Sequence, residues 1–94
     1  MTHVLVDEEI EARLRSSAWV REGDTIVREL KLESFAAVID YVDHLAAVAE
    51  QHNHHPDILI HGWNKLKLTL STHSEGGLTE LDFKLAKLFD ALLE

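Results

Sequence analysis

The sequence contains no cysteine, and this absence excludes several kinds of chemistry at once. Disulfide bonds, zinc–thiolate sites, iron–sulfur clusters and thiol nucleophiles all require that residue. No apolar run is longer than five residues, whereas a membrane-spanning helix needs about 20. The first residues also lack the basic and then apolar segments of a secretory signal. We therefore expect a cytoplasmic protein whose chemistry depends on histidine and carboxylate side chains.

Positive charge is also scarce. Lysine and arginine together number 9 against 17 aspartates and glutamates, which gives a net charge of −8. The basic residues are scattered and form no stripe that could neutralise a phosphate backbone. We therefore expect neither a nucleic-acid partner nor a membrane partner. With 94 residues, 46% of them hydrophobic, the chain has the size and composition of one globular domain spanning 1–94.

The pattern of apolar and turn residues predicts three helices and four strands. Asp7 is a candidate N-cap for a first helix, Ser34 for a long second helix that ends near 52–53, and Thr79 with Asp82 forms a capping-box pattern before the last. Hairpins are expected over 19–32 and over 58–72, with Gly76-Gly77 as a later turn. This order favours an α+β fold, in which three helices pack on one face of a four-stranded antiparallel sheet.

Each predicted element has an apolar face that we expect to contribute to the core. In the second hairpin the alternation places three leucines inward, whereas Arg28 interrupts the apolar face of the first. The helical spacing selects further candidates. The expected core residues are Phe35, Ile39, Val42, Leu45 or Ala46, and Ala49 in the second helix, Leu66, Leu68 and Leu70 in the hairpin, and Leu81, Leu85, Leu88 and Leu92 in the last helix.

The chain has seven histidines, and five of them fall within a short segment: His52, His54, His55, His61 and His73. Histidine has an unperturbed pKa of about 6.5, so it donates or accepts a proton near neutral pH. Three interpretations stay open from spacing alone. The histidines could be solvated or core-edge residues, they could bind a metal, or they could perform acid–base catalysis. The spacing of His52, His54 and His55 across a helix end is not a familiar metal-ligand pattern.

A longer pattern surrounds these histidines. The sequence runs Glu50-Gln-His-Asn-His54-His55-Pro56, then Trp63, the segment Ser71-Thr72-His73, and Asp82 at the end of Gly77-Leu-Thr-Glu-Leu-Asp. This pattern resembles the signature of the pterin-4a-carbinolamine dehydratase family, and Trp19 also matches a tryptophan of that family. The resemblance covers essentially the whole chain and implies the same α+β fold.

The resemblance implies an activity, and the residues that perform it. Members of this family remove water from a 4a-hydroxytetrahydropterin, made by aromatic amino acid hydroxylases, to give the quinonoid dihydropterin, without a cofactor or metal. By position, His54 and His73 match the acid–base pair, in an order left open, and His55 matches the histidine that orients the pterin. The other residues expected at the substrate are Glu50, which could orient His54, Pro56, Trp63 as an apolar wall, Thr72 and Asp82. Homodimers or homotetramers are expected.

Some positions depart from the family pattern. Asn53, Ile58 and Leu81 replace an aspartate, an aromatic residue and an arginine that many members have. The rival interpretation is a protein-binding or assembly-factor module on the same fold. Family relatives with such roles in assembly have lost catalytic histidines, whereas this sequence keeps them, so the pattern favours the enzyme.

Overall fold

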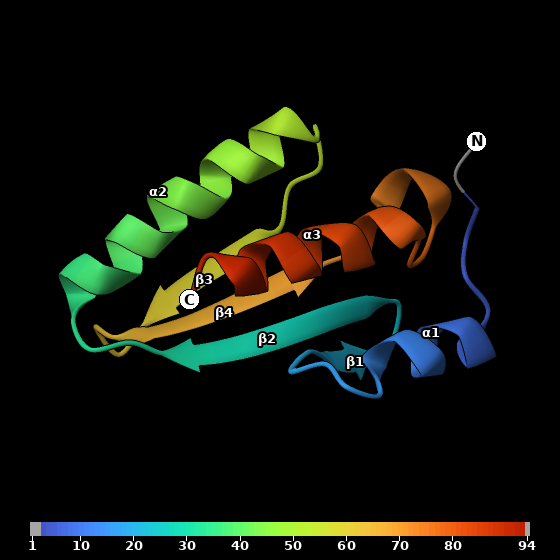
Figure 1. Ribbon diagram of the computed structural model, residues 1–94, viewed down its shortest axis with the longest axis horizontal. Coiled ribbons are helices and arrows are strands. Elements are labelled where there is room, and N and C mark those ends of the chain that lie inside the picture. The colour runs from blue at the N-terminus through green and yellow to red at the C-terminus, as the bar shows by residue number, and fades with distance from the viewer. Residues whose placement is uncertain (1–2, 94) are drawn as a thin grey trace.

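The computed structural model describes residues 3–93, and in this range it contains the predicted seven elements in the predicted order (Figure 1). They are α1 (Asp7–Leu14), β1 (Val20–Glu22), β2 (Thr25–Lys31), α2 (Phe35–Gln51), β3 (Asp57–His61), β4 (Lys65–Leu70) and α3 (Glu80–Ala91), with a short 3₁₀ turn η1 (His73–Glu75) before α3. None of the helices in the described range is long and apolar enough to cross a bilayer.

The four strands form one antiparallel sheet in the order β1-β2-β4-β3. The central strand β4 pairs with β2 on one side and β3 on the other, and its Leu66, Leu68 and Leu70 are completely buried. They belong to one core cluster with residues of α2 and α3, the helices that Figure 1 shows over the sheet. Leu5, Trp19 and Ile26 join this core from the first third of the chain. The α+β prediction is therefore confirmed.

The starts of the helices follow local hydrogen bonding. The Oγ of Ser34 accepts a hydrogen bond from the Ala37 amide at 3.0 Å, so Ser34 caps α2 as predicted. At α1 the prediction of Asp7 as the cap is wrong, because Asp7 is already helical and Val6 holds the cap position. The Glu9 carboxylate accepts from the Val6 amide at 3.0 Å and satisfies it in the absence of a capping side chain.

Two helix faces differ from the prediction. In α2 the buried residues are Val38, Tyr41, Leu45 and Ala49, whereas the expected core residues Phe35 and Ile39 are 54% and 38% exposed. In α3 the buried apolar residues are Phe83, Leu85, Ala86 and Phe89, whereas Leu81, Leu88 and Leu92 are only half-buried. Both helices are apolar over more than one stripe, so spacing alone did not identify which stripe faces the sheet.

Arg28, which interrupts the apolar face of the first hairpin, has a carboxylate partner in Asp90 of α3. Arg28 is half-buried on β2, and its guanidinium pairs with the Asp90 carboxylate. The same carboxylate oxygen accepts a hydrogen bond from the indole Nε1 of Trp19 at 2.9 Å. A polar contact therefore fixes the C-terminal half of α3 over β2 and beside the residue that precedes β1.

The protein's only tyrosine provides a spectroscopic test of this packing. Burial raises the pKa of the Tyr41 phenol to about 12, the Asp90 carboxylate adds to this rise, and Arg28 opposes it. Its hydroxyl donates to the carbonyl of Phe89 at 2.9 Å. Because the native state favours the neutral phenol, this contribution to stability is complete below pH 10 and is lost as the pH rises toward 12.

We therefore expect an ultraviolet absorbance titration of the folded protein to show phenolate formation with a midpoint near 12. The Tyr41→Phe variant should lack this spectral change. Its free energy of unfolding should also lose the pH dependence that arises from the phenol. A midpoint near 10, the ordinary value for tyrosine, in protein that circular dichroism shows to be folded would contradict the buried position of Tyr41.

Candidate active site

The end of α2 sets the direction of the paired histidines. Asn53 has a left-handed backbone with φ of 49°, a conformation that asparagine adopts more readily than most residues. Its amide donates to the carbonyl of Glu50 at 3.2 Å, and the amide of His54 donates to that of Ala49 at 3.1 Å. The chain thus leaves the helix in a closed turn, and Pro56 leads it into β3.

The side chain of His54 lies against a buried carboxylate. Its Nε2 is 2.6 Å from Oδ1 of Asp82, and the two side chains are 11% and 0% exposed. Asp82 is on the first turn of α3, so this contact joins the end of α2 to the beginning of α3. The sequence prediction placed Asp82 at the substrate. A completely buried side chain has no surface for a ligand to contact, so Asp82 can affect the site only through His54, whose side chain it contacts.

The second carboxylate oxygen of Asp82 is occupied by the loop after β4. Oδ2 accepts from the Thr79 amide at 2.9 Å, which confirms the predicted capping interaction, and from the Thr72 hydroxyl at 2.8 Å. The hydroxyls of Thr72 and Thr79 are 2.8 Å apart. Thr72 is itself buried and so belongs to the supports of the site.

His73 follows Thr72 directly and is exposed at the start of η1. The loop around it is closed by an isolated bridge between Thr72 and Gly77, and Gly76 has a left-handed φ of 77° that favours glycine. Because Thr72 and His54 both contact Asp82, His54 and His73 lie at the same end of the sheet. The prediction that His54 and His73 act as an acid–base pair stays a prediction.

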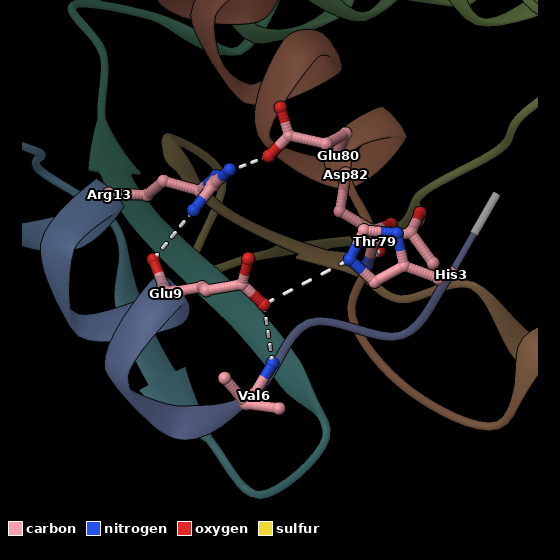
Figure 2. Close-up of polar contacts among 7 residues, drawn as sticks. All are labelled: His3, Val6, Glu9, Arg13, Thr79, Glu80 and Asp82. Carbon is pink, nitrogen blue, oxygen red and sulfur yellow. Dashed lines mark hydrogen bonds and ion pairs between the residues drawn. The ribbon is translucent and has the colours of Figure 1, made fainter.

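An N-terminal segment supports the same loop, a feature the sequence did not reveal. The Leu5 amide donates to the carbonyl of Leu78 at 2.8 Å, and a Cβ added to Gly77 would lie 2.9 Å from Val4. Figure 2 shows this segment passing the start of α3, where Arg13 of α1 contacts the Glu80 carboxylate. The loop that carries His73 is thus held from the side of α1 as well as from Asp82.

His55 has a partner of a different kind. Its Nε2 contacts the Glu50 carboxylate, and the two side chains are 55% and 75% exposed. The sequence prediction had Glu50 orienting His54 on a continuing helix. The helix ends at Gln51, and the left-handed turn at Asn53 directs His54 inward, which leaves Glu50 beside His55.

Trp63 does not join the histidines. It is 65% exposed, with a left-handed φ of 58°, in the turn between β3 and β4. Strand β3 begins next to Pro56 and β4 ends just before Ser71, so this turn lies at the opposite end of the hairpin from His54 and His73 (Figure 1). At about 3.3 Å per residue, the five residues of β3 alone separate them by more than 15 Å. Within one chain, Trp63 cannot form the expected apolar wall.

Among residues 3–93, no three histidine, aspartate or glutamate side chains are arranged to hold a metal ion. This observation does not test whether the activity needs a metal, so the metal-free activity stays a prediction.

A cavity of about 550 Å³ lies between α1 and α3. It is lined by ten residues that include Phe83 and Lys84, and none of the three site histidines borders it.

Fold and site together define a small α+β domain in which the adjacent His54 and His55 each contact a carboxylate, Asp82 and Glu50 respectively, just before β3. The sequence profile of the family described as pterin 4 alpha carbinolamine dehydratase matches residues 3–92. The chain belongs to this family.

Individual relatives agree with the profile. A protein of Nocardia farcinica, provisionally named a pterin-4-alpha-carbinolamine dehydratase, is 48% identical over 92 residues, which cover 97% of this chain and 96% of the relative. One from Natronomonas pharaonis with the same provisional name is 40% identical over the full length of both chains. The crystal structure of a transcriptional coactivator/pterin dehydratase from Brucella melitensis superposes with a TM-score of 0.90 at 32% identity, covering 96% of this chain and 98% of that one.

Proposed function

We propose that this protein is a dehydratase that removes water from a 4a-hydroxytetrahydropterin and so regenerates the pterin used by aromatic amino acid hydroxylases. The observation that carries the proposal is the position of the three histidines that match the family, all at the same end of the sheet. His54 lies on a buried carboxylate, His73 lies on a loop fixed to the same carboxylate, and His55 lies beside Glu50 at the surface.

The reaction requires two proton transfers. The bond between C4a and its hydroxyl oxygen breaks, the N5–H bond breaks, and a double bond forms between C4a and N5. Hydroxide is a poor leaving group, so an acid must protonate the oxygen while a base accepts the N5 proton, and the oxygen leaves as water. His54 and His73 supply these two groups. Imidazoles suit both roles near neutral pH, and no electron transfer is involved.

The other predicted site residues either orient the pterin or support the backbone around it. His55 is exposed and paired with Glu50, so it offers a polar contact at the entrance of the site. Pro56 fixes the backbone beyond the paired histidines, and Thr72 fixes the backbone before His73. Any contribution of Trp63 to binding requires a second copy of the chain.

A binding role on the same fold is the alternative. A pterin dehydratase-like protein identified as a RuBisCO assembly factor in the alpha-carboxysome superposes with a TM-score of 0.64 at 25% identity, covering 85% of this chain and 92% of that one. The complete histidine set and the buried carboxylate behind His54 support the enzyme over an assembly role for this chain.

Substitution of the paired histidines tests the mechanism. We expect His54→Ala and His73→Ala each to lower turnover on the order of a hundredfold, the usual range for one acid–base group. His55→Ala should act mainly on KM, because an orienting contact made equally in the ground and transition states changes KM more than turnover. A hydroxylase-coupled pterin assay, with the spontaneous dehydration subtracted, measures both quantities.

His44→Ala is the matched control, since His44 is exposed on α2 and its imidazole hydrogen-bonds to Asp40 of its own helix. Circular dichroism should show that all four variants fold. Wild-type turnover in both His54→Ala and His73→Ala would refute the assigned mechanism and favour the binding role.

Metal independence is a separate prediction. We expect fully active protein to contain no stoichiometric metal by elemental analysis and to keep its activity after dialysis against a chelator, because proton transfer between imidazoles and substrate needs no Lewis acid. Loss of activity to the chelator and its recovery with added zinc or iron would refute this.

We also propose a homodimer or homotetramer. The edge strand β3 exposes Ile58 and Leu59, and the outer stripe of α2 exposes Phe35 and Ile39. Unpaired strand edges and exposed apolar stripes are surfaces that proteins usually cover. The family resemblance implies assemblies of the same size.

Light scattering at micromolar concentration should therefore give a mass of two or four chains. Leu59→Asp and Phe35→Asp, which place a charge on the edge strand and on the helix stripe respectively, should lower that mass if the corresponding surface is the interface. A monomer mass for the unmodified protein would refute the proposal.

A further inference from the structure

The cavity between α1 and α3 lies apart from the three site histidines and has the size of a ligand site. Its volume is about 550 Å³, and small-molecule sites in proteins measure about 300–1,000 Å³. One wall is a face of α3 that includes Lys84 and Lys87, and the other is formed by the end of α1 and the turn that contains Ser16 and Ser17. The cavity is therefore large enough to hold a small organic molecule between two helices.

Both carboxylates that line this cavity have cationic partners. Glu80 pairs with Arg13, which reaches it from α1, as Figure 2 shows. Asp90 pairs with Arg28 of β2, which lies outside the cavity lining. The negative charges of the wall are therefore already compensated, and the charge that remains comes from the lysines.

Lys84 and Lys87 have no such compensation. Both are exposed, and neither forms an ion pair with any carboxylate of residues 3–93. They are three positions apart on one helix face, where two like charges repel each other. The chain has 17 acidic residues against 9 basic ones, yet these two neighbouring ammonium groups are left without a counter-charge. The cavity thus has two uncompensated positive charges in a protein whose net charge is −8.

The rest of the lining supplies hydroxyl donors and an apolar surface. The Oγ of Ser17 accepts from the Trp19 amide at 3.0 Å, a bond that does not use the hydroxyl hydrogen, so this hydrogen can be donated to a ligand. The hydroxyl of Ser16 is exposed beside it. Phe83 belongs to the core, is 8% exposed and also lines the cavity, together with Ala86. Cationic, hydroxyl and apolar groups therefore face the same space.

We infer that this cavity binds a small phosphate monoester that carries an apolar group, with its phosphate between Lys84 and Lys87 and its apolar group against Phe83. A phosphate monoester has a charge of about −1.5 to −2 at pH 7, which matches two ammonium groups, whereas one carboxylate would match only one. Lysine binds phosphate as a point charge, and serine hydroxyls donate to its oxygens. The inference goes beyond the proposed dehydration and does not rest on it, because none of the site histidines borders this cavity.

Phenyl phosphate is the probe that tests the inference on the complete chain. Calorimetric titration should show binding that weakens as salt is added, because exposed charges are screened. Inorganic phosphate, which lacks the ring, should bind more weakly, and phenol, which lacks the charge, should not bind. In nitrogen-15 NMR spectra the amide shifts caused by phenyl phosphate should be centred on Ser16, Ser17, Lys84 and Lys87.

A double variant tests the two lysines. Lys84→Ala combined with Lys87→Ala should lower the affinity for phenyl phosphate about tenfold or more, because both charged donors to the phosphate are lost. The matched control is Lys31→Ala combined with Lys65→Ala, which removes the same charge from exposed residues that lie opposite each other on β2 and β4. This control should keep the wild-type affinity within about twofold, since distant exposed charges are screened.

Ser16→Asp gives an independent test, because it places a negative charge at an exposed position of the cavity lining and removes no core contact. It should also weaken binding, and it decides the question if the double lysine variant does not fold. Equal losses of affinity in the two double variants would show unspecific attraction by charge and overturn the inference. Amide shifts centred on His54 and His73, or no binding by the wild type at millimolar phenyl phosphate, would overturn it as well. Each readout is binding, so the result is independent of dehydratase activity.

Discussion

The carboxylate of Asp82 is the interaction on which both the fold and the site depend. A charge that is completely buried is costly unless donors surround it, and here the donors come from three separate parts of the chain. Thr79 belongs to the cap of α3, Thr72 to the end of the second hairpin, and His54 to the exit of α2. Satisfying this one group therefore brings together the segments that carry the proposed catalytic histidines.

A second carboxylate, that of Asp90, fixes the other end of α3 to the rest of the fold. Asp90 binds the indole of Trp19 and the guanidinium of Arg28, which ties α3 to the first hairpin. Because both ends of α3 are fixed by polar contacts, the helix cannot slide along its apolar face without breaking hydrogen bonds. The orientation of the Asp82 side chain toward His54 depends on that restraint.

Much of this arrangement could be predicted from the sequence because it rests on local rules. The alternation of Leu66, Leu68 and Leu70, the cap at Ser34 and the pairing of Thr79 with Asp82 each follow from a few adjacent residues, and all are confirmed. The failures concern relations that local rules do not contain. The buried stripe of α2 depends on where the sheet lies, and the partner of Glu50 depends on a single left-handed residue, Asn53. The support of the His73 loop by the N-terminal segment depends on a contact across more than 70 positions.

Asn53 also explains why one departure from the family pattern leaves the site intact. Many members have aspartate at this position, and asparagine and aspartate are the residues other than glycine that most readily adopt a left-handed backbone. In this structure Asn53 closes the end of α2 by its backbone conformation, and the hydrogen bonds of the His54 and His55 side chains go to Asp82 and Glu50, not to the exposed side chain of Asn53. An exchange between these two residue types preserves the turn that directs His54 toward Asp82. The position is therefore constrained by the backbone geometry of the turn.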